Sequence, residues 1–165
     1  MNVLMTADTV GGVWTYAMEL TRALPDVRFT IATMGRKPSD GQRDEVPGNA
    51  ELVESEYKLE WQEEPWRDVD ESGRWLLDLE ERSRADVVHL NGYSHGALPF
   101  RAPKLVVAHS CVLSWWRAVK SEDAPPEWNT YRARVGQGLQ GASVVAAPSA
   151  WMLAALDERP DDGRH

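Results

Sequence analysis

The 165-residue chain contains a single cysteine, Cys111, and no extended hydrophobic run. One cysteine excludes an internal disulfide and is typical of proteins from a reducing compartment. The N-terminus lacks the basic residues and long apolar core of a secretory signal peptide, and no apolar run approaches the ~20 residues needed to span a bilayer. We therefore expect a cytoplasmic protein with no integral membrane segment.

Basic charge is also scarce. The chain has 18 Lys and Arg residues against 26 Asp and Glu residues, a net charge of −8. The imbalance is local, because residues 51–81 hold twelve acidic and three basic side chains, a net charge of −9. Such a segment is typical of a solvated face and argues against nucleic acid as a partner. The length is that of one domain.

Short apolar runs alternate with segments of helical periodicity along the chain. The apolar runs predict buried strands at 2–8, 28–34, 50–55, 86–90, 104–110 and 142–149. Helical spacing predicts helices at 13–24, 71–84 and 127–140, and another after Ser149. The segment between the second and third strands is rich in turn-forming residues and is predicted to be a loop.

Strands that are apolar throughout and separated by helices form parallel sheets covered on both faces. We therefore predict an α/β fold, a doubly wound, Rossmann-like parallel sheet of about six strands, over residues 1–156. Residues 157–165 are predicted to be a polar tail. The chain stops where a second domain could begin.

Polar and glycine-rich segments follow four of the predicted strands. They are Asp8–Gly12, Asn91–Gly96, His109–Cys111 and Pro148-Ser149. In open α/β sheets, ligands bind outside the carboxyl ends of the strands. The sequence therefore predicts a binding site at this edge of the sheet.

The dipeptide Gly11-Gly12 falls where a helix begins. Free amide groups and the helix dipole suit that position to a phosphate or a sugar hydroxyl; the alternative is a tight turn without a ligand. A complete G-x-G-x-x-G motif and a P-loop lysine are both absent, which disfavours dinucleotide binding and NTP hydrolysis.

His109 is either a satisfied core histidine or, because it lies at a strand end beside Ser110, a hydrogen-bonding site residue. The histidines and Cys111 match no common zinc spacing, so we expect no metal. The chain has eight tryptophans, which can simply fill the core. Trp14 and the pair Trp115-Trp116 follow strand ends, where an indole could stack on a sugar.

Four segments together resemble a known family. They are MNVLMTADTVGGVWTYAMELTRAL, DVVHLNGYSHGALPF, KLVVAHSCVLSWW and VVAAPSAWMLAAL, and in this order they resemble the amino-terminal domain of family 4, GT-B-fold glycosyltransferases. The resemblance covers residues 1–156. It implies retaining transfer of a sugar from a nucleotide-sugar donor to a sugar-type acceptor without a metal or other cofactor, in a cleft between two Rossmann-like domains.

On this resemblance Gly11 and Gly12 match the glycine loop that approaches the donor diphosphate and the acceptor. His109 matches the family histidine that hydrogen-bonds the transferred sugar. Asn91, Tyr93 and His95 would line the acceptor side.

The cationic, donor-binding carboxy-terminal domain of the family is missing from the chain. We therefore expect the chain to be inactive without a separate donor-binding domain or subunit. The alternative is a non-catalytic Rossmann-like module that binds a sugar or a phosphorylated metabolite.

Overall fold

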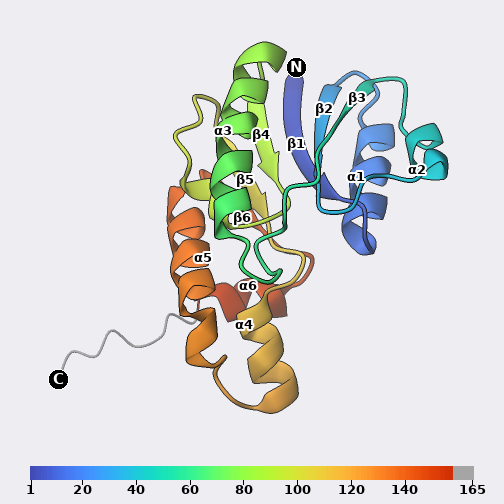
Figure 1. Cartoon of the computed structure of the whole chain (residues 1–165). Coiled ribbons are helices and arrows are strands. Elements are labelled where there is room, and N and C mark those ends of the chain that lie inside the picture. Colours follow the sequence, from blue (N-terminus) through green and yellow to red (C-terminus); the bar gives the residue numbers. More distant parts are fainter. Residues whose placement is uncertain (158–165) are drawn as a thin grey trace.

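The computed structural model describes residues 1–157 (Figure 1). Six parallel strands form one sheet in the order β3-β2-β1-β4-β5-β6. The strands are β1 (Asn2–Asp8), β2 (Arg28–Met34), β3 (Ala50–Glu54), β4 (Val87–Leu90), β5 (Lys104–Val107) and β6 (Val144–Ala146). The predicted doubly wound fold is confirmed. The predicted tail lies outside the described residues from residue 158 onward.

Helices connect successive strands. The α-helices are α1 (Gly12–Ala23), α2 (Asp40–Asp44), α3 (Trp66–Ser83), α4 (Val112–Trp115), α5 (Asn129–Gly141) and α6 (Ala150–Asp157). Three short turns complete the fold: η1 (Ser94–Ala97), the π-helical η2 (Trp116–Lys120) and η3 (Pro126–Trp128). No helix among residues 1–157 combines the length and apolar character needed to cross a bilayer.

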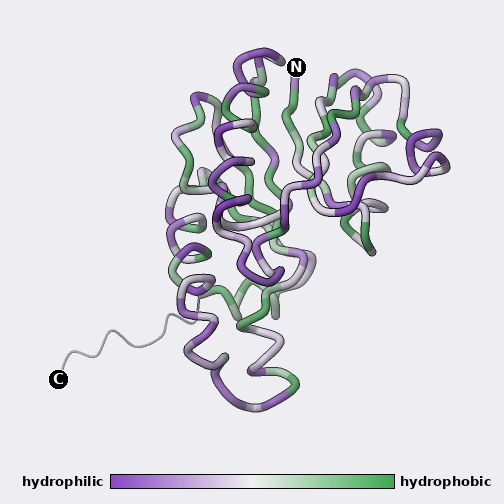
Figure 2. The backbone as a smooth tube through the Cα atoms, in the orientation of Figure 1, coloured by the Kyte–Doolittle hydropathy of each residue, from purple (hydrophilic) through white to green (hydrophobic). Residues whose placement is uncertain are grey.

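Two cores lie on opposite faces of the sheet. Val3 and Met5 of β1 pack with Ala17 and Met18 of α1, whereas Leu4 packs in the core that contains α3 and α5. Successive strand residues point to opposite faces, so the apolar run Val3–Met5 of β1 supplies both cores. The central strands are apolar along most of their length (Figure 2).

The strand order reverses beside β1. The chain runs from β1 outward to β2 and β3 and then returns to the other side of β1 as β4. β1 pairs with β2 over all seven of its residues but with β4 only at Val3–Met5. The backbone ladder between β1 and β4 therefore stops short of their carboxyl ends, beside the crevice of the topological switch point.

Glycines allow α5 to pack directly on the η1 turn. A Cβ atom on Gly138 would lie 1.8 Å from the carbonyl oxygen of Tyr93, and one on Gly141 would lie 2.4 Å from that of Gly96. Contacts this short are incompatible with any side chain. These glycines therefore hold the segment after β4 against α5.

Several element ends differ from the prediction. β5 ends at Val107 rather than at residue 110, and α3 begins at Trp66 rather than at residue 71. The loop predicted between β2 and β3 contains α2, whose first turn is closed by a capping box between Ser39 and Gln42. The S-x-x-Q pattern was the available signal for this helix.

Candidate functional site

A cavity, here called the rim pocket, lies at the carboxyl ends of β1, β4 and β5. Its lining comes from these strand ends and from the loop between β3 and α3, and it includes Asn91, Tyr93, His95, His109 and Ser110. These are five of the site residues predicted from the sequence. The cavity volume is about 80 Å³, well below the roughly 300–1,000 Å³ of typical small-molecule sites.

The side chain of Asn91 spans the crevice between β1 and β4. Its Nδ2 donates to the carbonyl oxygen of Thr6 at 2.7 Å, and its backbone N–H donates to Thr6 Oγ1 at 2.9 Å. Because a carbonyl oxygen can only accept, the amide nitrogen faces Thr6. Asn91 Oδ1 therefore faces His109, whose Nε2 lies 2.7 Å away.

This arrangement assigns the tautomer of His109. Asn91 Oδ1 can only accept, so His109 Nε2 carries the proton and donates it. Burial lowers the pKa of His109, which keeps the ring neutral at neutral pH. In a neutral ring Nδ1 then has a free lone pair. The edge of the ring of Tyr16 on α1 packs against His109, with ring centres 4.7 Å apart. His109 is thus an oriented hydrogen-bond acceptor.

His89 lies on β4 beneath this network and is 4% exposed. Its Nε2 is 3.3 Å from the hydroxyl of Tyr16. Burial lowers its pKa from 6.5 to about 4, an effect that a side-chain hydrogen bond with Asn91 partly opposes. His89 is therefore a neutral core residue rather than a part of the rim.

The depressed pKa of His89 predicts acid destabilisation. Below pH 6.5 the unfolded chain binds a proton at this position, whereas the folded chain binds it only near pH 4. Stability should therefore fall as the pH drops through this window, with about 3 kcal/mol as the upper limit for one group. A His89→Gln variant should lose less of its free energy of unfolding between pH 7 and pH 4 in urea titrations. An unchanged pH dependence in the variant would contradict this assignment.

Tyr93 and His95 form part of the wall of the rim pocket, and polar atoms of both side chains already have partners within the protein. The hydroxyl of Tyr93 donates to the carbonyl oxygen of Ser110 at 2.9 Å, and burial raises its pKa. His95 Nε2 contacts the carbonyl oxygen of Val69 at 2.9 Å and Ser72 Oγ at 3.1 Å. Burial lowers the pKa of His95, and its backbone bond to Val69 partly opposes that shift.

Gly11 and Gly12 lie beside the rim pocket but do not line it. Gly11 has φ +74°, a conformation that favours glycine. Gly12, the first residue of α1, has a negative φ, and a Cβ atom there would meet no atom within 4 Å. The fold therefore has a reason for glycine at position 11 and none at position 12.

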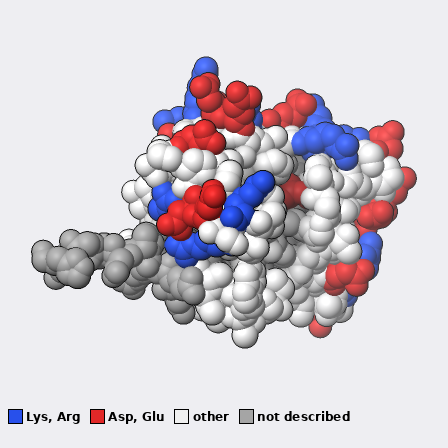
Figure 3. Space-filling model, turned by 90° about the horizontal axis from the view of Figure 1, so that it is seen from below, with Lys and Arg blue, Asp and Glu red and all other residues white. Residues whose placement is uncertain are grey.

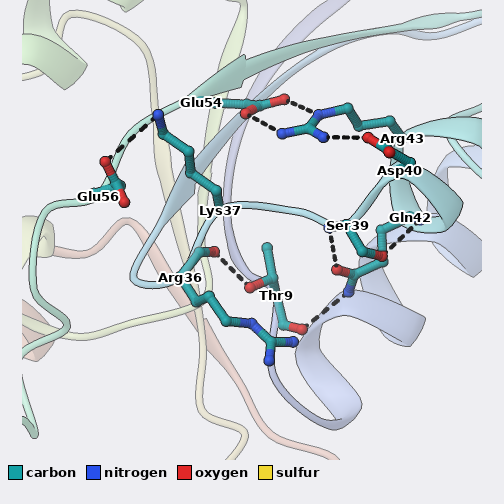
Figure 4. A network of polar contacts seen from close by, with 9 residues as sticks. All are labelled: Thr9, Arg36, Lys37, Ser39, Asp40, Gln42, Arg43, Glu54 and Glu56. Atoms are coloured by element: carbon teal, nitrogen blue, oxygen red, sulfur yellow. Dashed lines mark hydrogen bonds and ion pairs between the residues drawn. The ribbon is translucent and has the colours of Figure 1, made fainter.

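A polar network holds the loop that carries these glycines. The hydroxyl of Thr9 donates to the carbonyl oxygen of Arg36 at 2.6 Å, and Gln42 Nε2 donates to that of Thr9 at 2.9 Å (Figure 4). Arg43 in turn joins α2 to Glu54 at the end of β3 at 2.7 Å. The loop conformation is thus set by residues from β2, α2 and β3.

The tryptophans predicted to stack on a sugar lie elsewhere. Trp14 is 5% exposed, packs in the core beneath α1 and donates from Nε1 to Glu45 at 2.9 Å. It has no face free for a ligand, so that prediction is corrected. Trp115 is 50% exposed and packs edge-on against Trp116, but both lie outside the rim pocket.

Two acidic residues of the site were not among the predicted ones. Asp8 ends β1 and lines the pocket; burial raises the pKa of its carboxyl, an effect that the N–H of Val10 partly opposes. The strand-end rule could have selected it. Glu60 accepts from the backbone N–H groups of Tyr93 and Ser94 at 2.9 and 2.8 Å. It comes from a long loop without a motif, which left no signal.

The comparison with protein families decides what kind of domain this is. Residues 11–162 match the model of the glycosyl transferase 4-like domain. The chain belongs to this family. The match includes both glycines of the first loop and every residue from Asn91 to Ser110, so it contains most of the residues that line the rim pocket, apart from those at the end of β1.

Other comparisons are less informative. No match is found among curated proteins. Among solved structures, the chain is similar to a short-chain dehydrogenase/reductase (wide type) from Veillonella parvula DSM 2008, crystallised in complex with NADP. That match has a TM-score of 0.44 and 12% sequence identity, and it covers 88% of this chain and 67% of the other.

Proposed function

We propose that this glycosyl transferase 4-like domain is the acceptor-side half of a retaining enzyme that transfers a sugar from a nucleotide-sugar donor to a sugar-type acceptor. The observation that carries the proposal is the orientation of His109, whose Nε2 donates a hydrogen bond to Asn91 Oδ1 at 2.7 Å. Its free Nδ1 can accept a hydrogen bond from a hydroxyl of the transferred sugar. No protein-bound metal or organic cofactor takes part in this reaction.

The site requires a second, donor-binding domain, supplied by the same polypeptide or by another subunit. The rim pocket is too small for a whole nucleotide sugar, and Lys58 is the one Lys or Arg among the described residues that line it. Its Nζ already donates to the carbonyl oxygen of Glu63 at 2.9 Å. Stabilising the charge of a leaving diphosphate is commonly a large part of catalysis. Those cations must come from outside this domain.

The direct test compares the chain alone with the chain supplemented by its donor-binding domain. NMR of the chain alone should detect free sugars through the ring signals of His109, and nucleotide sugars should not be cleaved. Transfer should begin only when the second domain is added. Turnover by the chain alone would refute the two-domain proposal, and His109 signals that ignore every sugar would refute the sugar site.

A Gly12→Ala substitution separates ligand approach from folding. The alanine should leave the melting temperature unchanged or slightly higher, because a methyl group fits the structure and alanine favours a helix by up to about 1 kcal/mol. Nucleotide-sugar binding by the assembled enzyme should weaken roughly tenfold, which is a loss of about 1.4 kcal/mol.

The matched control for this test is Gly48→Ala, which also places a methyl group in open space but far from the rim pocket. It should leave binding unchanged in calorimetric titrations with UDP-, GDP- and ADP-sugars. Equal affinity in wild type and Gly12→Ala would place the ligand away from this loop.

A further inference from the structure

A second concavity, here called the aromatic groove, opens beside the rim pocket. It lies between residues 60–67, which lead into α3, and residues 127–131, where η3 passes into α5. Its volume is about 730 Å³. Glu60, Trp61 and Tyr131 line both cavities, so the groove continues directly from the candidate site.

The groove is lined by aromatic rings, three of which contact a neighbouring side chain that holds them in place. The guanidinium of Arg134 lies 5.3 Å from the ring centre of Trp66, and Trp128 packs edge-on against Tyr131 with ring centres 5.6 Å apart. Trp61 is 50% exposed. Indole faces bind the C–H faces of sugars, and rings already held in place lose little entropy on binding. The lining therefore suits a carbohydrate.

The charge around the groove is negative. Glu63, Glu64 and Glu127 line it and are exposed, and among the described residues none of the three carboxylates has a cationic partner. Arg67, the cation of the lining, is paired with Glu71 at 3.0 Å. Unpaired carboxylates at an open site repel phosphate and carboxylate groups and attract ammonium groups.

The remainder of this end of the molecule is different. Seen from the carboxyl ends of the strands, much of the surface carries no charge (Figure 3). Acidic side chains lie along its margins, and one acidic group nearer the middle lies beside basic side chains (Figure 3).

We propose that the aromatic groove binds the acceptor and that this acceptor is a carbohydrate with at least one ammonium group, an amino sugar. That the bound carbohydrate is the acceptor rests on the proposed function. That the groove binds a carbohydrate does not. The aromatic rings bind the sugar faces, while the free carboxylates of Glu63, Glu64 and Glu127 select the positive charge. Phosphorylated and uronic acid acceptors are excluded by the same charges.

The test measures the binding of three sugar tetramers to the full chain by tryptophan fluorescence and by calorimetry. The probes are the glucosamine tetramer from chitosan, its fully N-acetylated form and the galacturonic acid tetramer, at a pH where the amines are protonated. The glucosamine tetramer should bind roughly tenfold more tightly than the N-acetylated one, because a few partly exposed ion pairs supply that ratio. The galacturonate should not bind, and added salt should reduce the preference.

Variants separate the contribution of aromatic stacking to tetramer binding from that of the carboxylates. Trp61→Ala should weaken both neutral and cationic tetramers by a similar factor. The double variant Glu63→Gln, Glu127→Gln should bind the neutral tetramer as before and lose the preference for the amine. Trp151→Ala removes an exposed indole of α6 outside the groove and should change neither.

The outcomes are separable. Equal binding of the neutral and cationic tetramers, or binding of the galacturonate, overturns the selection of an amine. If Trp61→Ala does not change tetramer binding, the aromatic groove is not the binding site, even where the His109 signals still respond to sugars. Groove binding that persists in an assembled enzyme without any transferase activity overturns the proposed function and leaves the groove standing.

Discussion

Replacing Gly138 with alanine is expected to destabilise the domain by about 3 kcal/mol. The added Cβ atom would lie 1.8 Å from the carbonyl oxygen of Tyr93, which is backbone and cannot move aside as a side-chain end can. Either α5 or the η1 turn must shift, and both carry the wall of the rim pocket. Urea unfolding followed by circular dichroism measures the loss.

Gly136 provides a matched control within the same helix. A Cβ atom there would meet nothing within 4 Å, so Gly136→Ala should raise the free energy of unfolding by roughly 0.5–1 kcal/mol through helix propensity alone. If the two alanine substitutions change the free energy of unfolding with opposite signs, the loss at Gly138 is due to the close contact between α5 and the η1 turn. Equal effects of the two substitutions would mean that α5 and η1 are not in backbone contact.

Replacing His109 with alanine is expected to lower the transfer rate of the assembled enzyme about 10- to 100-fold, the loss of one well-placed hydrogen bond at a half-buried site. The pH dependence has a definite sign. Protonation of Nδ1 removes the lone pair, and the pKa of His109 lies below its ordinary value. Activity should therefore be flat at neutral pH and fall only on the acidic side of pH 6.5.

A double-mutant cycle identifies the route of the effect. Asn91 acts by orienting His109, so Asn91→Ala should lower the rate by itself, yet add almost nothing to His109→Ala. Steady-state kinetics and circular dichroism of all four proteins are needed, because Asn91 also joins β4 to β1 through Thr6. Full activity of His109→Ala, or additive losses at the two positions, would remove the proposed pair from the site.

The positions of the strands along the chain were accessible from the sequence because a parallel, doubly covered sheet requires apolar runs. Val3, Leu4 and Met5 illustrate the reason: successive residues supply two different cores. The same regularity placed Asn91 and His109 at neighbouring strand ends, where the structure brings them within 2.7 Å. Periodicity therefore predicted both the fold and the edge at which the rim pocket lies.

The errors have physical causes that periodicity does not encode. Trp14 was assigned to the rim because it follows a strand end, yet its place on α1 turns the indole into the core. Glu60 is held by backbone amides of a segment more than thirty positions away, and no local pattern specifies such a contact.

The short pairing between β1 and β4 connects the stability of the sheet with the rim pocket. Beyond Met5 the seam between the two halves of the sheet is closed by the Asn91 side chain rather than by another backbone ladder. One amide thus belongs at once to the architecture and to the rim pocket. A ligand that binds the rim pocket of the folded domain and not the unfolded chain should therefore also raise the stability of the sheet.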